Sequence, residues 1–138
     1  MSFMEWSEDY AVGVPSIDRQ HQQFFMFINA LHEALHKGEG ADVIRQTIED
    51  LADYAAFHFL AEETLLKQIH YSMFLNHSSE HADFTHKIQE FRDKHHAGNF
   101  MLALPVMDFM KNWLASHILE SDKKYGKFLH DNHITFEQ

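Results

Sequence analysis

The 138-residue sequence predicts an all-α protein with a single domain, an up-down-up-down antiparallel four-helix bundle preceded by an N-terminal arm. Hydrophobic residues recur at three- and four-residue intervals along four long segments, which is the period of an amphipathic helix. Only 5 Gly and 2 Pro interrupt the chain, and 45% of its residues are hydrophobic, a composition that favours a packed helical core. Four long helices joined by short connections most economically form such a bundle.

The first predicted helix follows an arm formed by residues 1–15. We expect Ser16 to cap its N-terminus, because a serine hydroxyl can accept a hydrogen bond from a free backbone N–H of the first turn. The helix is expected to end at the sequence KGEG, residues 37–40, where two glycines interrupt the hydrophobic pattern.

The other three helices are bounded by similar turn signals. The second is predicted over residues 41–69, and the third runs from the connection HYSMF to Gly98, a residue type suited to a helix C-terminus. The fourth begins near Pro105, since proline is accepted in a first helical turn. Residues 127–138 are expected to form a C-terminal tail.

Composition excludes several classes of function. With 21 acidic and 11 basic residues, the formal charge of −10 argues against a nucleic-acid or anionic-membrane partner. The absence of cysteine leaves only His, Asp and Glu as strong metal ligands. The N-terminus lacks the charged and apolar regions of a signal peptide, and no apolar run reaches membrane-spanning length, so we expect a cytoplasmic protein.

The inner face of every predicted helix carries histidine, and two of the faces also carry an acid. If the faces meet at one level, unpaired ionisable groups in an apolar core would cost several kcal/mol, a cost that bound metal would offset. Imidazole with carboxylate suits iron, and bridging carboxylates suit a metal pair. The candidate ligands are His21, His58, Glu62, His77, His81, His117 and Asp122.

Asp122 is the least regular member of this set. It lies five residues after His117, and at about 100° per residue an α-helix would turn it roughly 140° away from that histidine. The sequence therefore places it on the shoulder of the inner face, and it can join the other ligands only at a site between helices.

The string HSSEH, residues 77–81, also matches the H-x-x-E-H signature of a zinc peptidase. That hypothesis needs Glu80 beside the metal as a general base and leaves the ligands on the other helices unexplained. We therefore predict that Glu80 faces solvent. The other histidines are predicted to be solvated or at a polar end of the bundle: His32, His36, His70, His86, His95, His96, His130 and His133.

Taken together, these residues resemble the hemerythrins, particularly the single-domain bacterial hemerythrins. The resemblance spans most of the chain in family order and spacing. It rests on DRQH at 18–21, HFLAEE at 58–63, Tyr71, HSSEH at 77–81, WLASHILESD at 113–122 and Tyr125.

The resemblance implies a non-haem centre of two iron ions per chain with a bridging oxo or hydroxo group. His77, His81 and His117 would bind one iron, His21 and His58 the other, and Glu62 and Asp122 would bridge both. These donors fall one short of filling two six-coordinate irons, and dioxygen would bind at the open position on the iron of His21 and His58. The expected walls of the oxygen pocket are Phe24, Phe25, Ile28, Phe59, Trp113, Leu114 and Ile118.

The leading functional hypothesis is reversible dioxygen binding for storage, transport, delivery or scavenging. The apolar pocket residues offer no obvious general acid or base, so we expect a binding protein rather than an enzyme. Two alternatives stay open: a sensor of oxygen or nitric oxide that acts through an unidentified partner, and a di-iron enzyme acting on peroxide or nitrogen oxides. The resemblance also implies a monomer, with an oxygen-consuming or signalling protein as a possible partner.

Overall fold

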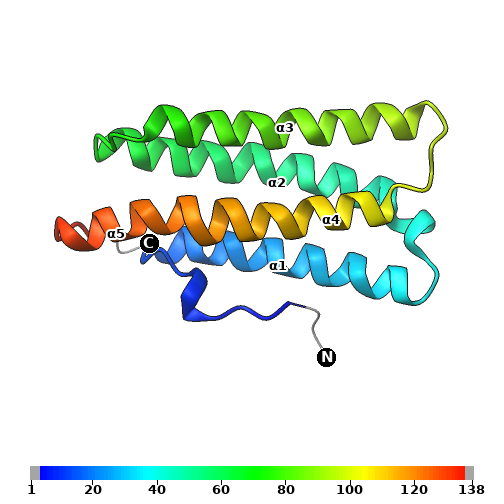
Figure 1. The fold of residues 1–138 in the computed structure, drawn as a ribbon, viewed down its shortest axis with the longest axis horizontal. Coiled ribbons are helices and arrows are strands. Elements are labelled where there is room, and N and C mark those ends of the chain that lie inside the picture. Colours follow the sequence, from blue (N-terminus) through cyan, green and yellow to red (C-terminus); the bar gives the residue numbers. More distant parts are fainter. Residues whose placement is uncertain (1–3, 136–138) are drawn as a thin grey trace.

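The computed structural model describes residues 4–135 and confirms the predicted four-helix bundle (Figure 1). Three of the four helices are continuous: α1 (Pro15–His36), α2 (Gly40–Gln68) and α3 (Phe74–His96). The fourth is built from three consecutive pieces: α4 (Ala103–Trp113), a π-helix (Leu114–Asp122) and α5 (Lys123–Asp131). The helices lie along the long axis of the molecule and alternate in direction, which brings residues distant in sequence to one level of the bundle.

The N-terminus of α1 differs from the prediction. Ser16 does not cap the helix; the cap position is Val14, which makes no side-chain cap hydrogen bond, and Pro15 is the first helical residue. Proline suits that position because its ring fixes φ near the helical value and its missing N–H would lack a partner there in any case. Asp18 in the first turn instead accepts a 2.8 Å hydrogen bond from the backbone N–H of Val12, which ties the arm to the helix.

The ends of α1 and α3 confirm the predicted breaks. Gly38 and Gly98 both adopt left-handed backbone conformations, with φ of 75° and 101°. Glycine adopts this conformation without a steric penalty, and it allows the chain to leave the helix while the last carbonyls still accept hydrogen bonds. In both cases the N–H of the following residue bonds back to the carbonyl five residues earlier.

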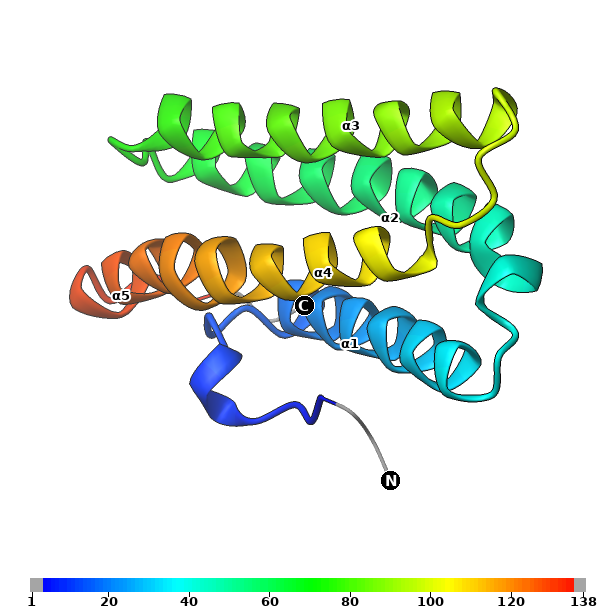
Figure 2. The same ribbon diagram turned by 45° about the vertical axis from the view of Figure 1, so that its right-hand side comes forward.

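The N-terminal arm packs against the outside of the bundle beside α1 (Figure 2). Trp6 and Tyr10 meet the ring of Phe25 edge-on, with centroids 5.6 and 4.7 Å away. Farther along, the backbone of Val12 approaches α5 so closely that a Cβ on Gly126 would lie 3.0 Å from the Val12 carbonyl oxygen. The arm is therefore part of the packed structure.

The C-terminal part of the chain also departs from the expected boundary. Residues 127–131, predicted to begin the tail, continue helix α5. Leu129 in this helix is buried in a small apolar cluster with Val12 of the arm, Leu66 of α2 and Tyr125. Part of the predicted tail, residues 136–138, lies outside the described residues.

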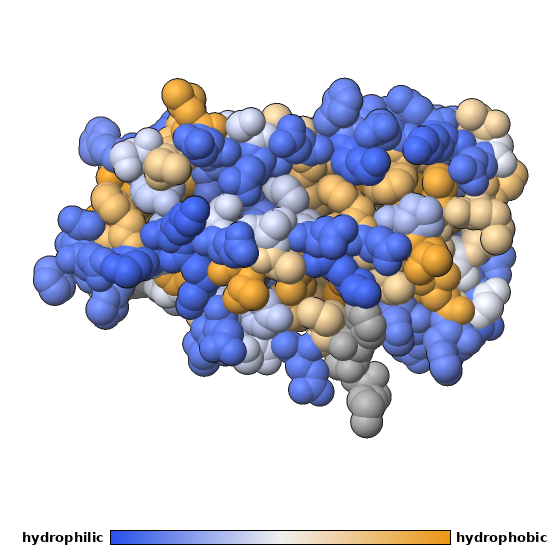
Figure 3. Space-filling view, in the orientation of Figure 1, coloured by the Kyte–Doolittle hydropathy of each residue, from blue (hydrophilic) through white to orange (hydrophobic). Residues whose placement is uncertain are grey.

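On the face drawn in Figure 3, hydrophilic side chains predominate, and apolar side chains gather between the helices, more of them towards the right-hand side of the view. Within residues 4–135, no helix combines the length and the apolar character needed to cross a bilayer.

Candidate metal centre

All seven side chains that the sequence singled out as ligands meet inside the bundle. Each is at most 3% exposed, and together they are the buried polar or charged residues of the described chain. They come from every helix: His21 from α1, His58 and Glu62 from α2, His77 and His81 from α3, and His117 and Asp122 from the π-helix. Helix packing thus concentrates ionisable groups in a core that is otherwise apolar.

The donor atoms form two groups, and within each group the atoms lie within 4.8 Å of one another. One group contains three imidazoles, those of His77, His81 and His117, together with Glu62. The other contains His21, His58, Glu62 and Asp122. We call them the three-histidine position and the two-histidine position.

Both carboxylates lie between the two positions. Oε1 of Glu62 is 2.7 Å from Nε2 of His77, whereas its Oε2 is 3.5 Å from Nε2 of His58. Asp122 has the same arrangement, with Oδ1 3.1 Å from Nε2 of His117 and Oδ2 3.0 Å from Nε2 of His21. Each acid therefore directs one oxygen towards each position, which is the arrangement that a carboxylate bridging two cations requires.

The π-helix explains how Asp122 joins the site. Its backbone bonds join residues five apart, so residue i+5 takes the place on the helix face that residue i+4 takes in an α-helix. Asp122, which an α-helix would turn away from His117, therefore faces the same side. This wide turn is the local structure that brings Asp122 to the other candidate ligands.

Hydrogen bonds on the outer nitrogens orient three of the imidazoles. Nδ1 of His58 lies 2.6 Å from the amide oxygen of Gln20, and Nδ1 of His81 lies 2.9 Å from Glu63. A carbonyl or carboxylate oxygen can only accept, so each Nδ1 carries a proton, and Nε2 is the nitrogen left to face the centre. Acceptors on the outer nitrogen are the usual companions of metal-binding histidines.

Glu80 is the third of these acceptors, and the prediction that it faces solvent holds only in part. Although its side chain is 39% exposed, Oε1 accepts a 2.8 Å hydrogen bond from Nδ1 of His117, and both carboxylate oxygens accept from the hydroxyl of Ser121. Glu80 therefore anchors a ligand from behind instead of working on a metal-bound water, as the peptidase hypothesis required.

The residues fit a pair of bound cations. Nε2 of His117 and both carboxylate oxygens of Asp122 are buried and make no well-aligned hydrogen bond within residues 4–135, although imidazole nitrogens lie 2.9–3.1 Å from the two oxygens. Nε2 of His21 and Nε2 of His58 lie 3.2 Å apart, and both are within 3.6 Å of Oε2 of Glu62. Cations would satisfy these lone pairs and offset the buried carboxylates.

The pKa shifts of the buried groups also favour bound cations. Burial alone would lower the pKa values of His21 and His77, but Asp122 and Glu62 raise both to about 9. Burial lowers the pKa of His58 to about 3. Burial would raise the pKa of Glu62, but the surrounding histidines hold it well below its usual range. The carboxylates thus stay ionised and draw positive charge into the core.

Tyr125 supports the site from within the bundle. Its hydroxyl donates a 2.7 Å hydrogen bond to Oε2 of Glu62, and neither side chain is exposed. Burial and the charge of Glu62 raise the pKa of this phenol well above its ordinary value, so it keeps the proton that it donates.

The seven residues predicted to wall an oxygen pocket all lie in one buried apolar cluster. Two of them stack directly on imidazoles: Phe59 on His81, with centroids 3.9 Å apart, and Trp113 on His117, with centroids 4.0 Å apart. Phe25 instead packs under the aromatic residues of the arm. The stacked rings hold the orientation of these two imidazoles and cover them with apolar surface.

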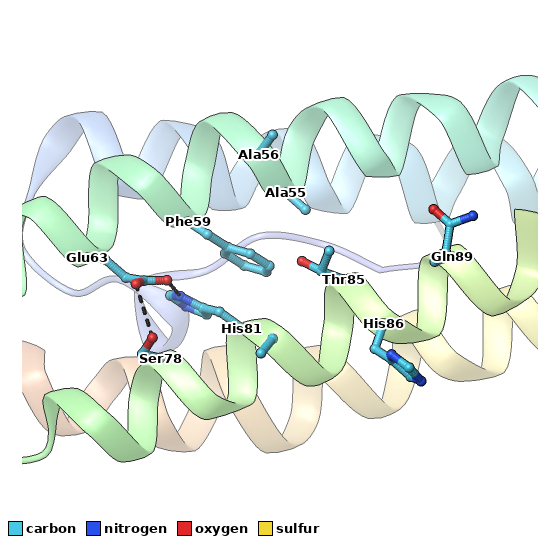
Figure 4. Close-up of a pocket in the computed structure, with 10 residues that line it drawn as sticks. Ala55, Ala56, Phe59, Glu63, Ser78, His81, Thr85, His86 and Gln89 are labelled. Atoms are coloured by element: carbon cyan, nitrogen blue, oxygen red, sulfur yellow. Dashed lines mark hydrogen bonds and ion pairs between the residues drawn. The ribbon is translucent and has the colours of Figure 1, made fainter.

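An open groove of about 530 Å³ runs between α2 and α3 and reaches the edge of the site (Figure 4). Phe59, His81 and Glu63 line one part of it, and Glu63 also accepts a hydrogen bond from Ser78. The histidines predicted to lie outside the site do so. They are either half-buried, His32 and His95, or exposed, His36, His70, His86, His96, His130 and His133.

The family model described as the hemerythrin HHE cation-binding domain matches residues 12–129. The chain belongs to the hemerythrin family. It is 31% identical over 130 residues to a bacteriohemerythrin of Methylococcus capsulatus, covering 94% of this chain and 98% of the relative. A bacteriohemerythrin of Clostridium acetobutylicum is 32% identical over 124 residues, covering 87% and 96%. A crystal structure of wild-type hemerythrin has 30% sequence identity to this chain and superposes on it with a TM-score of 0.82; the match covers 91% of this chain and 97% of the hemerythrin chain.

Within this hemerythrin fold, sequence reasoning missed the acceptors Gln20, Glu63 and Glu80. Gln20, Glu63 and Glu80 are each next in sequence to a candidate ligand, yet each bonds to a histidine on another helix. A polar side chain beside a ligand on the shoulder of a helix is the sequence feature that could have identified them. The partner of each depends on how neighbouring helices pack.

Proposed function

We propose that this hemerythrin-family protein binds dioxygen reversibly at a non-haem di-iron centre and serves in oxygen storage, transport, delivery or scavenging. One observation carries the proposal: two buried carboxylates each direct one oxygen to a three-histidine position and the other to a two-histidine position. Donor sets of imidazole and shared carboxylate suit a pair of iron ions and lack the sulfur typical of structural zinc.

His77, His81 and His117 would hold one iron, and His21 and His58 the other, with Glu62 and Asp122 shared. Two adjacent ferrous ions can together supply the two electrons that dioxygen accepts when it binds reversibly. The unequal number of histidines leaves the two-histidine position with fewer protein donors, so we assign oxygen to that side.

The protein's own contribution is to hold the ligands and exclude water. Phe59 and Trp113 stack on two of the imidazoles, and both are at most 7% exposed. An apolar surround of this kind slows the escape of charged products from the site. It also disfavours side reactions with water. The seven predicted pocket residues include no obvious general acid or base, which favours binding over turnover.

The test is an oxygen cycle followed by visible absorption. Anaerobically reduced, iron-loaded protein should be nearly colourless, develop a visible charge-transfer band when oxygen is added, and lose the band when oxygen is removed. A band that never forms, or one that forms once and does not reverse, would contradict the proposal. Loss of the band that requires an added substrate, with turnover of that substrate, would favour an enzyme instead.

A further inference from the structure

The outer nitrogens of the histidines do not have equivalent partners in the two positions. In the three-histidine position, Nδ1 of His81 and Nδ1 of His117 each bond to a carboxylate, at 2.9 and 2.8 Å. In the two-histidine position, Nδ1 of His58 bonds to the neutral amide of Gln20 at 2.6 Å. Nδ1 of His21 is buried and makes no hydrogen bond within residues 4–135.

This difference changes how strongly each imidazole donates to a cation. A cation on Nε2 makes the Nδ1 proton more positive, and a carboxylate acceptor stabilises that added charge more than an amide does. Such acceptors raise ligand basicity, and their loss typically lowers metal affinity about 10–100-fold. Glu62 and Asp122 contact both positions, so the positions differ in their number of histidines, three against two, and in the acceptors behind those histidines.

We infer that Gln20 is a positioning residue that keeps the two-histidine position the weaker cation site, so that the three-histidine position fills first. This inference rests on the proposed pair of metal positions and goes beyond it by assigning an order of loading to a residue that is not itself a ligand. Gln20 lies on α1 beside His21 but acts on α2 through His58. The amide orients the ring without giving it the extra charge that a glutamate would.

The weaker donation has a consequence for the proposed oxygen side. A neutral partner makes the cation held by His58 less electron-rich than a carboxylate partner would. The position that is expected to take oxygen is then the one from which the metal dissociates more readily.

The experiment is a titration of metal-free protein with Co²⁺ under argon, followed by visible absorption and calorimetry. The unaltered chain should bind two ions in two separable steps, and His58→Ala should remove only the weaker step. Gln20→Glu should tighten the weaker step by about tenfold or more and leave the stronger step in place. Glu80→Gln should weaken the stronger step instead.

Gln22→Glu is the matched control, because it makes the same charge change two residues away at an exposed position of α1. It should leave both steps unchanged. The inference is overturned if Gln20→Glu weakens or fails to change the second step, or if Gln22→Glu tightens it equally. A merely structural role for Gln20 predicts weakening. Binding of fewer than two ions to the unaltered chain would instead overturn the proposed di-metal centre.

Discussion

Two buried tyrosines should respond in opposite ways when their hydroxyl groups are removed. Tyr125 donates a 2.7 Å hydrogen bond to ionised Glu62, and both side chains are 0% exposed. The hydroxyl of Tyr54 is also buried, but it has no hydrogen-bond partner in the described part of the chain, and its ring stacks on His58. Replacing either residue with Phe keeps the ring and its packing.

The expected size follows from what each hydroxyl contacts. A hydrogen bond to a charged group contributes about 1.5–3 kcal/mol, so Tyr125→Phe should lower the free energy of unfolding by about that amount and Tm by about 5–12 °C. Glu62 would keep only longer contacts on that oxygen, with His58 at 3.5 Å and His21 at 3.6 Å. Tyr54→Phe should be neutral or stabilise by up to about 1 kcal/mol, because it removes a buried polar group that lacks a partner.

The measurement is urea unfolding of metal-free chains followed by circular dichroism, repeated with chains loaded to the same metal content. The unaltered chain and both variants are compared under one set of conditions, so that metal binding does not mask the difference. Equal losses in the two variants, or no loss in Tyr125→Phe, would show that the hydrogen bond to Glu62 does not stabilise the fold.

Three further predictions test packing and electrostatics. Gly126→Ala should destabilise the fold by about 1–3 kcal/mol in urea unfolding, since its Cβ would meet the backbone of Val12 at 3.0 Å; an unchanged midpoint would contradict that contact. Phe59→Ala should cost about 3 kcal/mol or more in the same assay and speed irreversible oxidation of the iron-loaded protein, with wild-type rates as the contrary result. Metal-free protein should lose stability as pH rises from 6.5 to about 9, because the folded state holds protons on His21 and His77 that the unfolded state releases. Cation affinity should rise over the same interval, because binding displaces those protons; stability that rises with pH would have the wrong sign.

The fold and the meeting of seven ionisable side chains in its core were predictable because they follow from periodic patterns. Hydrophobic residues spaced three and four apart define the helix faces, and the ionisable residues on those faces stand out because burying them is costly. The end of α1 was predictable for a related local reason, since the left-handed turn at Gly38 suits few other residues. Ser16 was not a cap because the adjacent Pro15 is better suited to begin the helix.

The remaining features depend on tertiary packing. The segment LASHILESD contains no glycine or proline that would predict a π-helix. The only indication in the sequence is that His117 and Asp122 are five residues apart although both belong to the site. Glu80 does lie at a partly exposed position of α3, as its spacing indicates, but its long side chain reaches back to His117 on the neighbouring helix. Sequence periodicity predicts which face of a helix a residue occupies. A hydrogen bond such as that between Glu80 and His117 depends also on which helix packs beside that face.

Anomalous diffraction at the iron edge, from crystals of the iron-loaded protein, would show whether the seven buried side chains hold two iron ions. We predict two iron peaks per chain, one at ligand distance from His77, His81 and His117 and the other from His21 and His58, with Glu62 and Asp122 between them. A single peak, or iron bound away from these residues, would contradict the account.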